Sequence, residues 1–183
     1  MALSRARPVA GNIAFFTEIE KDVIEILALP RDAAKIAKDV LEMRALIEAE
    51  KPPRDGWDLK LIPGGIIDLE FIAQFAVLTG NIDGPVIAQS TAEVLGRLDT
   101  GLVDPATTDT LVQAANLYTG VTQLIRLCLS GDVRDFPPGL GDLICRSCDL
   151  PDLKRVESHL QETSKSVRKI FDVMLREARK KTK

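Results

Sequence analysis

The stretch LKRVESHLQETSKSVRKIFDVM, residues 153–174, decides the fold class. Apolar side chains recur in it three and four positions apart, and only Thr163 interrupts the series with a polar side chain. Such spacing places one apolar seam along a helix, which suits packing along another long helix, as in a coiled coil. We therefore expect a long helix that starts near Asp152. Its seam consists of Leu153, Val156, Leu160, Val167, Ile170 and Met174.

Further helices are predicted upstream from apolar spacing and from start and stop signals. Asp32 is an expected N-cap, and Asp104 with Pro105 is an expected N-cap and first helical residue. Prolines at 30 and at 52–53 end the first two helices. The expected helices span residues 12–29, 33–51, 66–78, a shorter segment ending near 98, and 105–129.

The first two helices are expected to be amphipathic, whereas 66–78 is apolar almost all round and is expected to be the buried central helix. Gly101 is an expected C-cap for the short helix. A polar connector containing Trp57 is expected at 51–63, and a glycine- and proline-rich loop at 130–141. The two expected apolar stripes are Phe16, Ile19, Val23 and Ile26, and Ala33, Ile36, Val40, Met43 and Ile47.

No segment alternates at the two-residue period of a strand. The 183 residues are enough for one domain with a core that needs no disulfide or metal. Because aromatic residues are only 4% of the chain, that core must be mostly aliphatic. We predict an all-α fold, an antiparallel bundle of about six to seven helices in a single domain, with amphipathic helices at 12–51 and the main bundle at 58–183.

Charge and cysteine content bear on partners and compartment. The formal net charge of −3 gives no general reason to bind nucleic acid, and the basic residues near the C-terminus suit the negative end of a solvated helix. Three cysteines without disulfide-framework spacing indicate a reducing compartment. Neither a signal peptide nor a membrane-spanning apolar run is recognised, so a cytoplasmic protein without a membrane partner is expected.

One polar constellation stands out, in the stretch DLKLIPGGIIDLEFIAQ at residues 58–74. Gly64 and Gly65 would expose backbone N–H groups at a helix start, with Lys60 just before them, which predicts contact with a phosphate group of a ligand. The alternative interpretation is structural. Glycines also permit close packing, and Asp68 would offset the helix dipole.

Two further residues of this motif, Glu70 and Gln74, also fit the structural interpretation. Glu70 and Gln74 are four positions apart and share a helix face, and Lys60 with Glu70 could form a partly buried ion pair. Both interpretations of the motif stay open at this point. Charge reversal at Lys60 would separate them, since only the structural role predicts loss of the fold.

Other chemistry is disfavoured, and no catalytic or metal-binding residue is assigned. Asp68 and Glu70 are two apart on a helix and point to different sides, so they cannot converge on one Mg²⁺. Cys145 and Cys148 lack the second pair of ligands that a zinc site needs, and His159 is the only histidine. A Walker A loop, a GxGxxG fingerprint and a nucleophile elbow are all missing from the sequence. The chain therefore does not carry a complete active site.

The motif at 58–74 closely resembles one found in bacterial glutamine synthetase adenylyltransferases, at the start of the helical domain that follows each nucleotidyltransferase domain. Three other segments, at residues 2–11, 30–53 and 143–175, resemble the C-terminal part of the same enzymes. The resemblance covers nearly the whole chain. It implies that residues 1–11 are a connector from an upstream nucleotidyltransferase domain, whose Gly-Ser and Asp-x-Asp signature the chain lacks.

What the resemblance implies about function is an accessory or regulatory helical domain. Such a domain would support transfer of AMP from ATP to glutamine synthetase in nitrogen regulation. ATP and Mg²⁺ would belong to the full-length enzyme, and this chain would bind no cofactor itself. The implied partners are the enzyme's own nucleotidyltransferase domain, glutamine synthetase and the PII protein. Two alternatives remain, a protein-interaction module that binds PII or glutamine synthetase without touching nucleotide, and a glutamine-sensing domain.

Overall fold

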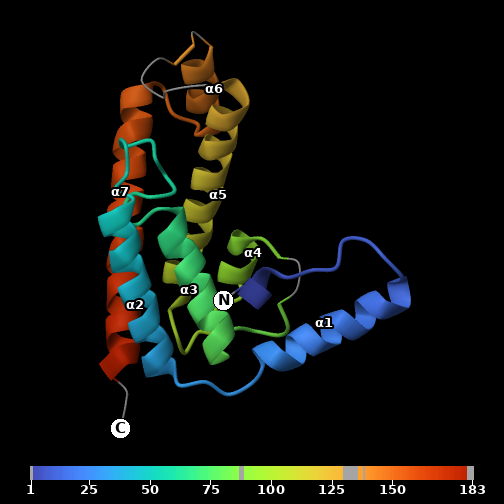
Figure 1. Ribbon diagram of the computed structural model, residues 1–183. Helices are drawn as coiled ribbons and strands as arrows, with labels where there is room; N and C mark the ends of the chain where they lie inside the picture. The colour runs from blue at the N-terminus through green and yellow to red at the C-terminus, as the bar shows by residue number, and fades with distance from the viewer. Residues whose placement is uncertain (1, 87–88, 130–135, 138, 181–183) are drawn as a thin grey trace.

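The computed structural model describes residues 2–86, 89–129, 136–137 and 139–180. The described residues form a short 3-10 helix and seven α-helices and no strand, which confirms the predicted all-α bundle (Figure 1). The predicted helices at 12–29, 33–51, 66–78 and 105–129, and the long last helix, are all present. The elements are η1 (Ala2–Arg5), α1 (Ile13–Leu27), α2 (Ala33–Glu50), α3 (Ile66–Thr79), α4 (Thr91–Leu95), α5 (Pro105–Cys128), α6 (Leu140–Ser147) and α7 (Leu153–Lys180).

Helix α7 contacts most of the other helices of the bundle, and its buried residues confirm the predicted seam. Four seam residues, Val156, Leu160, Val167 and Met174, are buried, and Phe171 joins them. Helices α2, α3, α5 and α6 all pack against α7 (Figure 1). Burying this seam stabilises the fold because each large aliphatic side chain removed from water contributes about 1.5–3 kcal/mol.

Helix α3 lies at the centre of the bundle, as its nearly continuous apolar sequence predicted (Figure 1). It packs against α2, α4, α5 and α7, so little of its surface can face water. Ile72, Phe75 and Ala76 are essentially inaccessible. The helix ends at Gly80, whose φ of 71° is a left-handed conformation that glycine adopts at little cost.

Helix α2 runs antiparallel to α7, because Glu48 near its end contacts Arg168 in the middle of α7, whereas Ala34 at its start lies beside Met174. The prediction from the sequence placed α1 and α2 together at 12–51, before the main bundle at 58–183. In the structure, α2 packs on α3 and α7. Part of its predicted stripe is wrong, since Met43 is exposed and Arg44 is buried in its place. Arg44 is buried because its guanidinium group pairs with the carboxylate of Asp68 on α3.

Helix α1 leaves the bundle at an angle (Figure 1). It joins the core through its last two turns, where Val23 and Leu27 are buried. Ile26 was predicted on the buried stripe and is exposed, because Val23 and Leu27 face the core and Ile26 lies to one side of that face. Asn12 caps the start, with its side-chain oxygen accepting from the N–H of Ala14 at 2.9 Å.

Two boundaries differ from the predictions. The cap of α4 is Gly96 and not Gly101, because an isolated bridge between Ile82 and Leu98 takes the chain away from the helix at this point. The predicted loop at 130–141 ends earlier than expected, since α6 begins at Leu140. Residues 130–135 and 138 of that loop lie outside the described residues.

Candidate functional site

The turn before α3 brings the chain very close to α7. Gly64 has a φ of 78°, and a Cβ atom built on it would lie 1.8 Å from the backbone oxygen of Ser164. A Cβ atom on Gly65 would lie 2.3 Å from the backbone oxygen of Leu59. No side chain fits at either position without moving backbone. Gly64 therefore permits close packing of the turn against α7, and Gly65 permits close packing within the motif itself.

Asp68, in the first turn of α3, is a completely buried carboxylate at 0% exposure. Its Oδ1 accepts a hydrogen bond from Nε of Arg44, on α2. Its Oδ2 accepts from the N–H of Gly64 at 2.6 Å and from Nη1 of Arg168, on α7, at 3.2 Å. One carboxylate thus joins three helices and closes the glycine turn.

The two guanidinium groups have further partners around this carboxylate. Arg44, 1% exposed, donates through Nη2 to the carbonyl oxygens of Leu61 and Ile62, each at 3.1 Å. Arg168 lies 2.7 Å from an oxygen of Glu48 and 5.2 Å above the ring of Phe171. Desolvation lowers the pKa of Arg168, but the carboxylates of Asp68, Glu48 and Asp172 outweigh that effect and raise it. Arg168 therefore stays charged.

The motif in the sequence did not point to Arg44 or Arg168, although the sequence carries one signal for Arg44. Arg44 lies four residues after Val40 and three before Ile47, which places it on the apolar stripe of its own helix. A basic residue on a buried stripe requires a buried acid, because an unpaired charge in a core is strongly unfavourable. Asp68, in the most apolar helix of the chain, is the acid that satisfies this requirement.

The other predicted site residues do not gather at one point. Lys60 is exposed, whereas Glu70 and Gln74 are half-buried on α3. Gln74 and Glu70 line a small depression with Ser4 of η1, away from Lys60. Lys60 lines a different hollow, between the connector at 51–61 and the end of α5.

The backbone N–H groups at the start of α3 already have acceptors. Gly64 donates to Asp68, Gly65 donates to the oxygen of Ile62 at 2.9 Å, and Ile66 donates to that of Leu59 at 2.8 Å. An anion at this helix end would have to displace these bonds. The geometry therefore favours the structural interpretation of Gly64 and Gly65, while a phosphate contact by Lys60 stays a prediction.

The three cysteines lie at the end of α5 and in and just after α6. Cys145 in α6 and Cys148 just after it are half-buried, and Cys128 at the end of α5 is exposed. Desolvation raises the pKa of Cys145, which disfavours the reactive thiolate. His159 is exposed on α7. In the described ranges, no three acidic, histidine or cysteine side chains are grouped so as to hold a metal ion, and no helix there is long and apolar enough to cross a membrane.

The chain is similar in sequence to curated bacterial enzymes of one kind. The chain is 51% identical over 181 residues to a bifunctional glutamine synthetase adenylyltransferase/adenylyl-removing enzyme of Mesorhizobium japonicum, and the match covers 98% of the chain and 18% of that protein. It is 52% identical over 177 residues to the corresponding protein of Brucella suis, again across 96% of the chain and 18% of the relative. It is 46% identical over 178 residues to the corresponding protein of Bartonella quintana, a match that covers 96% of the chain and 18% of the relative.

The chain belongs to the glutamine synthetase adenylyltransferase family. It spans about a fifth of the length of the relatives it matches, so it corresponds to one segment of such an enzyme. No family model matches the chain, and no solved structure matches it.

In this segment of a glutamine synthetase adenylyltransferase, the acidic residues of the motif do not fit a Mg²⁺ site. Asp68 is buried and already bound by two guanidinium groups, and Glu70 lies on another side of α3. Two carboxylates that face apart cannot share one metal ion.

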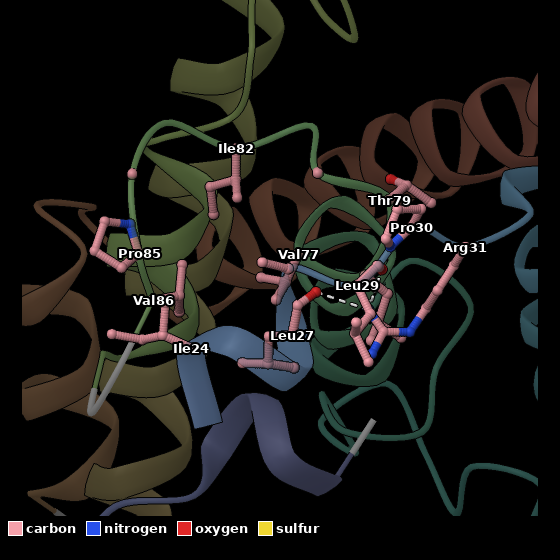
Figure 2. Close-up of a pocket in the computed structure, with 14 residues that line it drawn as sticks. Ile24, Leu27, Leu29, Pro30, Arg31, Val77, Thr79, Ile82, Pro85 and Val86 are labelled. Carbon is pink, nitrogen blue, oxygen red and sulfur yellow. Dashed lines mark hydrogen bonds between the residues drawn. The ribbon is translucent and has the colours of Figure 1, made fainter. Parts of the chain in front are cut away.

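A hollow of about 440 Å³ lies where α1 ends, and it bears on glutamine sensing (Figure 2). Leu27 of α1, Val77 of α3 and Val86 help to form its apolar wall. The guanidinium of Arg31 faces this region but donates to the carbonyl oxygens of Ile26, Leu27 and Leu29. Glutamine carries an ammonium and a carboxylate group that need charged or hydrogen-bonding partners. This apolar hollow therefore gives no support to a glutamine site.

Proposed function

We propose that this chain is an accessory helical domain of a glutamine synthetase adenylyltransferase. It packs against the enzyme's nucleotidyltransferase domain and supports AMP transfer from ATP to glutamine synthetase, without supplying a catalytic residue. The observation that carries the proposal is the surface of α1. Ile13 is 79% exposed and Phe15 is 60% exposed, on a helix whose first turns extend from the bundle.

Several features support a domain contact at this surface. Val9 precedes α1 and is exposed, and Ile26 and Leu29 are exposed at its other end. An apolar surface of this kind is unfavourable in water and is typical of an interaction site. The relatives are more than five times longer than the matched segment, so the enzyme has further domains that could cover it.

Reconstitution of activity tests this proposal. The nucleotidyltransferase portion of the Mesorhizobium japonicum relative would be expressed separately and supplied with ATP, Mg²⁺ and glutamine synthetase, with and without this chain. We expect AMP transfer to appear or to rise strongly when the chain is added. Unchanged activity with both pieces folded would reject an accessory role, and AMP transfer by this chain alone would reject the absence of catalytic residues.

A matched pair of variants locates the contact. Ile13→Ser removes an apolar side chain that is 79% exposed on α1, and Leu127→Ser removes one that is 83% exposed near the end of α5. Neither change touches the core, so both variants should fold. We expect Ile13→Ser to raise the concentration of chain needed for half-maximal stimulation and Leu127→Ser to leave it unchanged. Equal effects would show that α1 is not the contact surface.

A further inference from the structure

A hollow of about 440 Å³ lies between the connector at 51–61 and the last turns of α5. Its volume is within the range of ordinary small-molecule sites. Four cationic side chains from two separate parts of the chain line it: Lys51, Arg54, Lys60 and Arg126. In a chain with a net charge of −3, this is a local concentration of positive charge.

The carboxylates at this hollow do not neutralise it. Asp55 accepts from the backbone N–H of Trp57 at 2.8 Å, and Asp58 lies 3.9 Å from Nε of Arg54. Within the described part of the chain, Lys51, Lys60 and Arg126 have no carboxylate within ion-pair distance. Three cations therefore line one concave site without an anionic partner among the residues that the structure describes.

An aromatic side chain completes the wall. Trp57 is half-buried and lines the hollow. Its ring meets that of Phe136 edge to face, with centroids 5.0 Å apart and planes at 80°. This contact restricts the orientation of the indole. A fixed aromatic ring beside cations suits a ligand that combines a planar base with several negative charges.

We infer that this hollow binds a nucleoside polyphosphate, with Lys51, Lys60 and Arg126 on the phosphates and Trp57 against the base. A polyphosphate concentrates several charges in a few ångströms, which matches cations gathered around one hollow better than an extended acidic peptide does. The inference places the phosphate contact of Lys60 on the α5 side and away from Gly64 and Gly65. It goes beyond the proposed function, because binding would occur on this chain alone, whether or not the chain supports AMP transfer.

Trp57 itself provides the measurement, since it is the only tryptophan of the chain. Its fluorescence would be followed while the 183-residue chain is titrated with pyrophosphate and, separately, with ATP. We expect a saturable change with both ligands, tighter binding of ATP because its base adds a stacking contact, and weaker binding of both as salt rises. Similar affinities for the two would mean that phosphate alone is recognised and would overturn the assignment of Trp57 to the base.

Substitutions identify the site. Lys60→Gln and Arg126→Gln should each weaken pyrophosphate binding about tenfold or more, as expected for a charge-assisted hydrogen bond. Lys165→Gln makes the same change in charge on α7, at another hollow, and should leave affinity unchanged. For Trp57→Leu, equilibrium dialysis should show lower affinity for ATP and unaltered affinity for pyrophosphate.

Three results would overturn the inference. The first is no saturable fluorescence change and no retention in dialysis up to millimolar ligand. The second is equal affinity in the Lys60→Gln, Arg126→Gln and unsubstituted chains. The third is that poly-glutamate displaces ATP at lower concentrations than pyrophosphate does, which would make the hollow a docking surface for an acidic protein segment.

Discussion

At Asp68, one carboxylate organises the charged part of the core. It contacts Arg44 from α2, Arg168 from α7 and the backbone N–H of Gly64 in the turn that leads into α3. A buried ion pair contributes little net stability relative to apolar residues, but breaking it leaves an uncompensated charge. We therefore expect its main effect to be on the register of the three helices, since a shift of one helix would separate these groups.

Replacing Asp68 should lower the free energy of unfolding far more than replacing Asp172, a partly exposed carboxylate that also pairs with Arg168. Asp68→Asn leaves the buried guanidinium of Arg44 with only the partly exposed carboxylate of Glu48, at 3.4 Å, so we expect a loss of about 3–5 kcal/mol in the free energy of unfolding, measured with urea. Asp172→Asn, at a carboxylate that also pairs with Arg168 but is 29% exposed, should cost at most about 1 kcal/mol. Adding Arg44→Met to Asp68→Asn should recover part of the loss. Similar losses for the two single variants would contradict this account of the cluster.

Gly64 and Gly120 are a second matched pair. Gly64→Ala forces a Cβ atom into the backbone of Ser164, so we expect a loss of at least about 2 kcal/mol in the free energy of unfolding. Gly120 lies within α5 with open space where a Cβ atom would be, so Gly120→Ala should stabilise the chain by about 1 kcal/mol. Thermal unfolding of both variants would reveal the opposite shifts. A neutral Gly64→Ala variant would show that α7 can move away from the turn.

At the scale of the elements, α7 and α1 play opposite roles. Both are amphipathic, but the apolar seam of α7 is covered by four other helices along its length. Helix α1 is buried only near its C-terminal end, at Val23 and Leu27; Ile19 is partly buried against the core, and η1 also contacts the helix. Helix α7 therefore holds the bundle together, whereas α1 presents part of its apolar surface to the outside.

Alanine substitution of one phenylalanine in each helix would test this difference through the free energy of unfolding. Phe171 of α7 is fully buried, and we expect Phe171→Ala to lower the free energy of unfolding by about 3–5 kcal/mol through loss of burial and a residual cavity. Phe15 of α1 is 60% exposed, so Phe15→Ala should change it by less than about 0.5 kcal/mol. Urea unfolding of the two variants gives the comparison. A large loss for Phe15→Ala would mean that the first turns of α1 pack on the bundle in solution.

At the scale of the whole molecule, stability is distributed unevenly. Helix α3 is surrounded by four helices at the centre, and α1 extends from one side (Figure 1). Regions with few buried apolar contacts open at lower free energy than the core. The same geometry that leaves α1 free to contact another domain makes it the least protected helix of the isolated chain.

Hydrogen exchange should resolve this gradient. We expect the amides in the first two turns of α1 to exchange well before global unfolding, and the amides of α3 to exchange only through global unfolding. Mass spectrometry of peptides covering residues 13–20 and 66–79 would make the comparison. Adding the nucleotidyltransferase portion of a relative should slow exchange at 13–20. Equal protection of the two helices in the isolated chain would contradict the gradient.

The sequence by itself determined the helical class, most helix boundaries, the seam of α7 and the central place of α3. These follow from local signals, because caps, prolines and apolar spacing act within a few residues. Only the tertiary structure decided that Arg44 replaces Met43 in the core, that Gly64 touches α7, and that Lys60 joins Arg126 at one hollow. Each of these depends on a partner far away in the chain, and periodicity within one helix cannot specify such a partner. The tertiary structure also decided that α1 packs on the bundle mainly through its C-terminal end. An apolar stripe shows which residues of a helix are apolar, but it does not show how much of the stripe another helix covers.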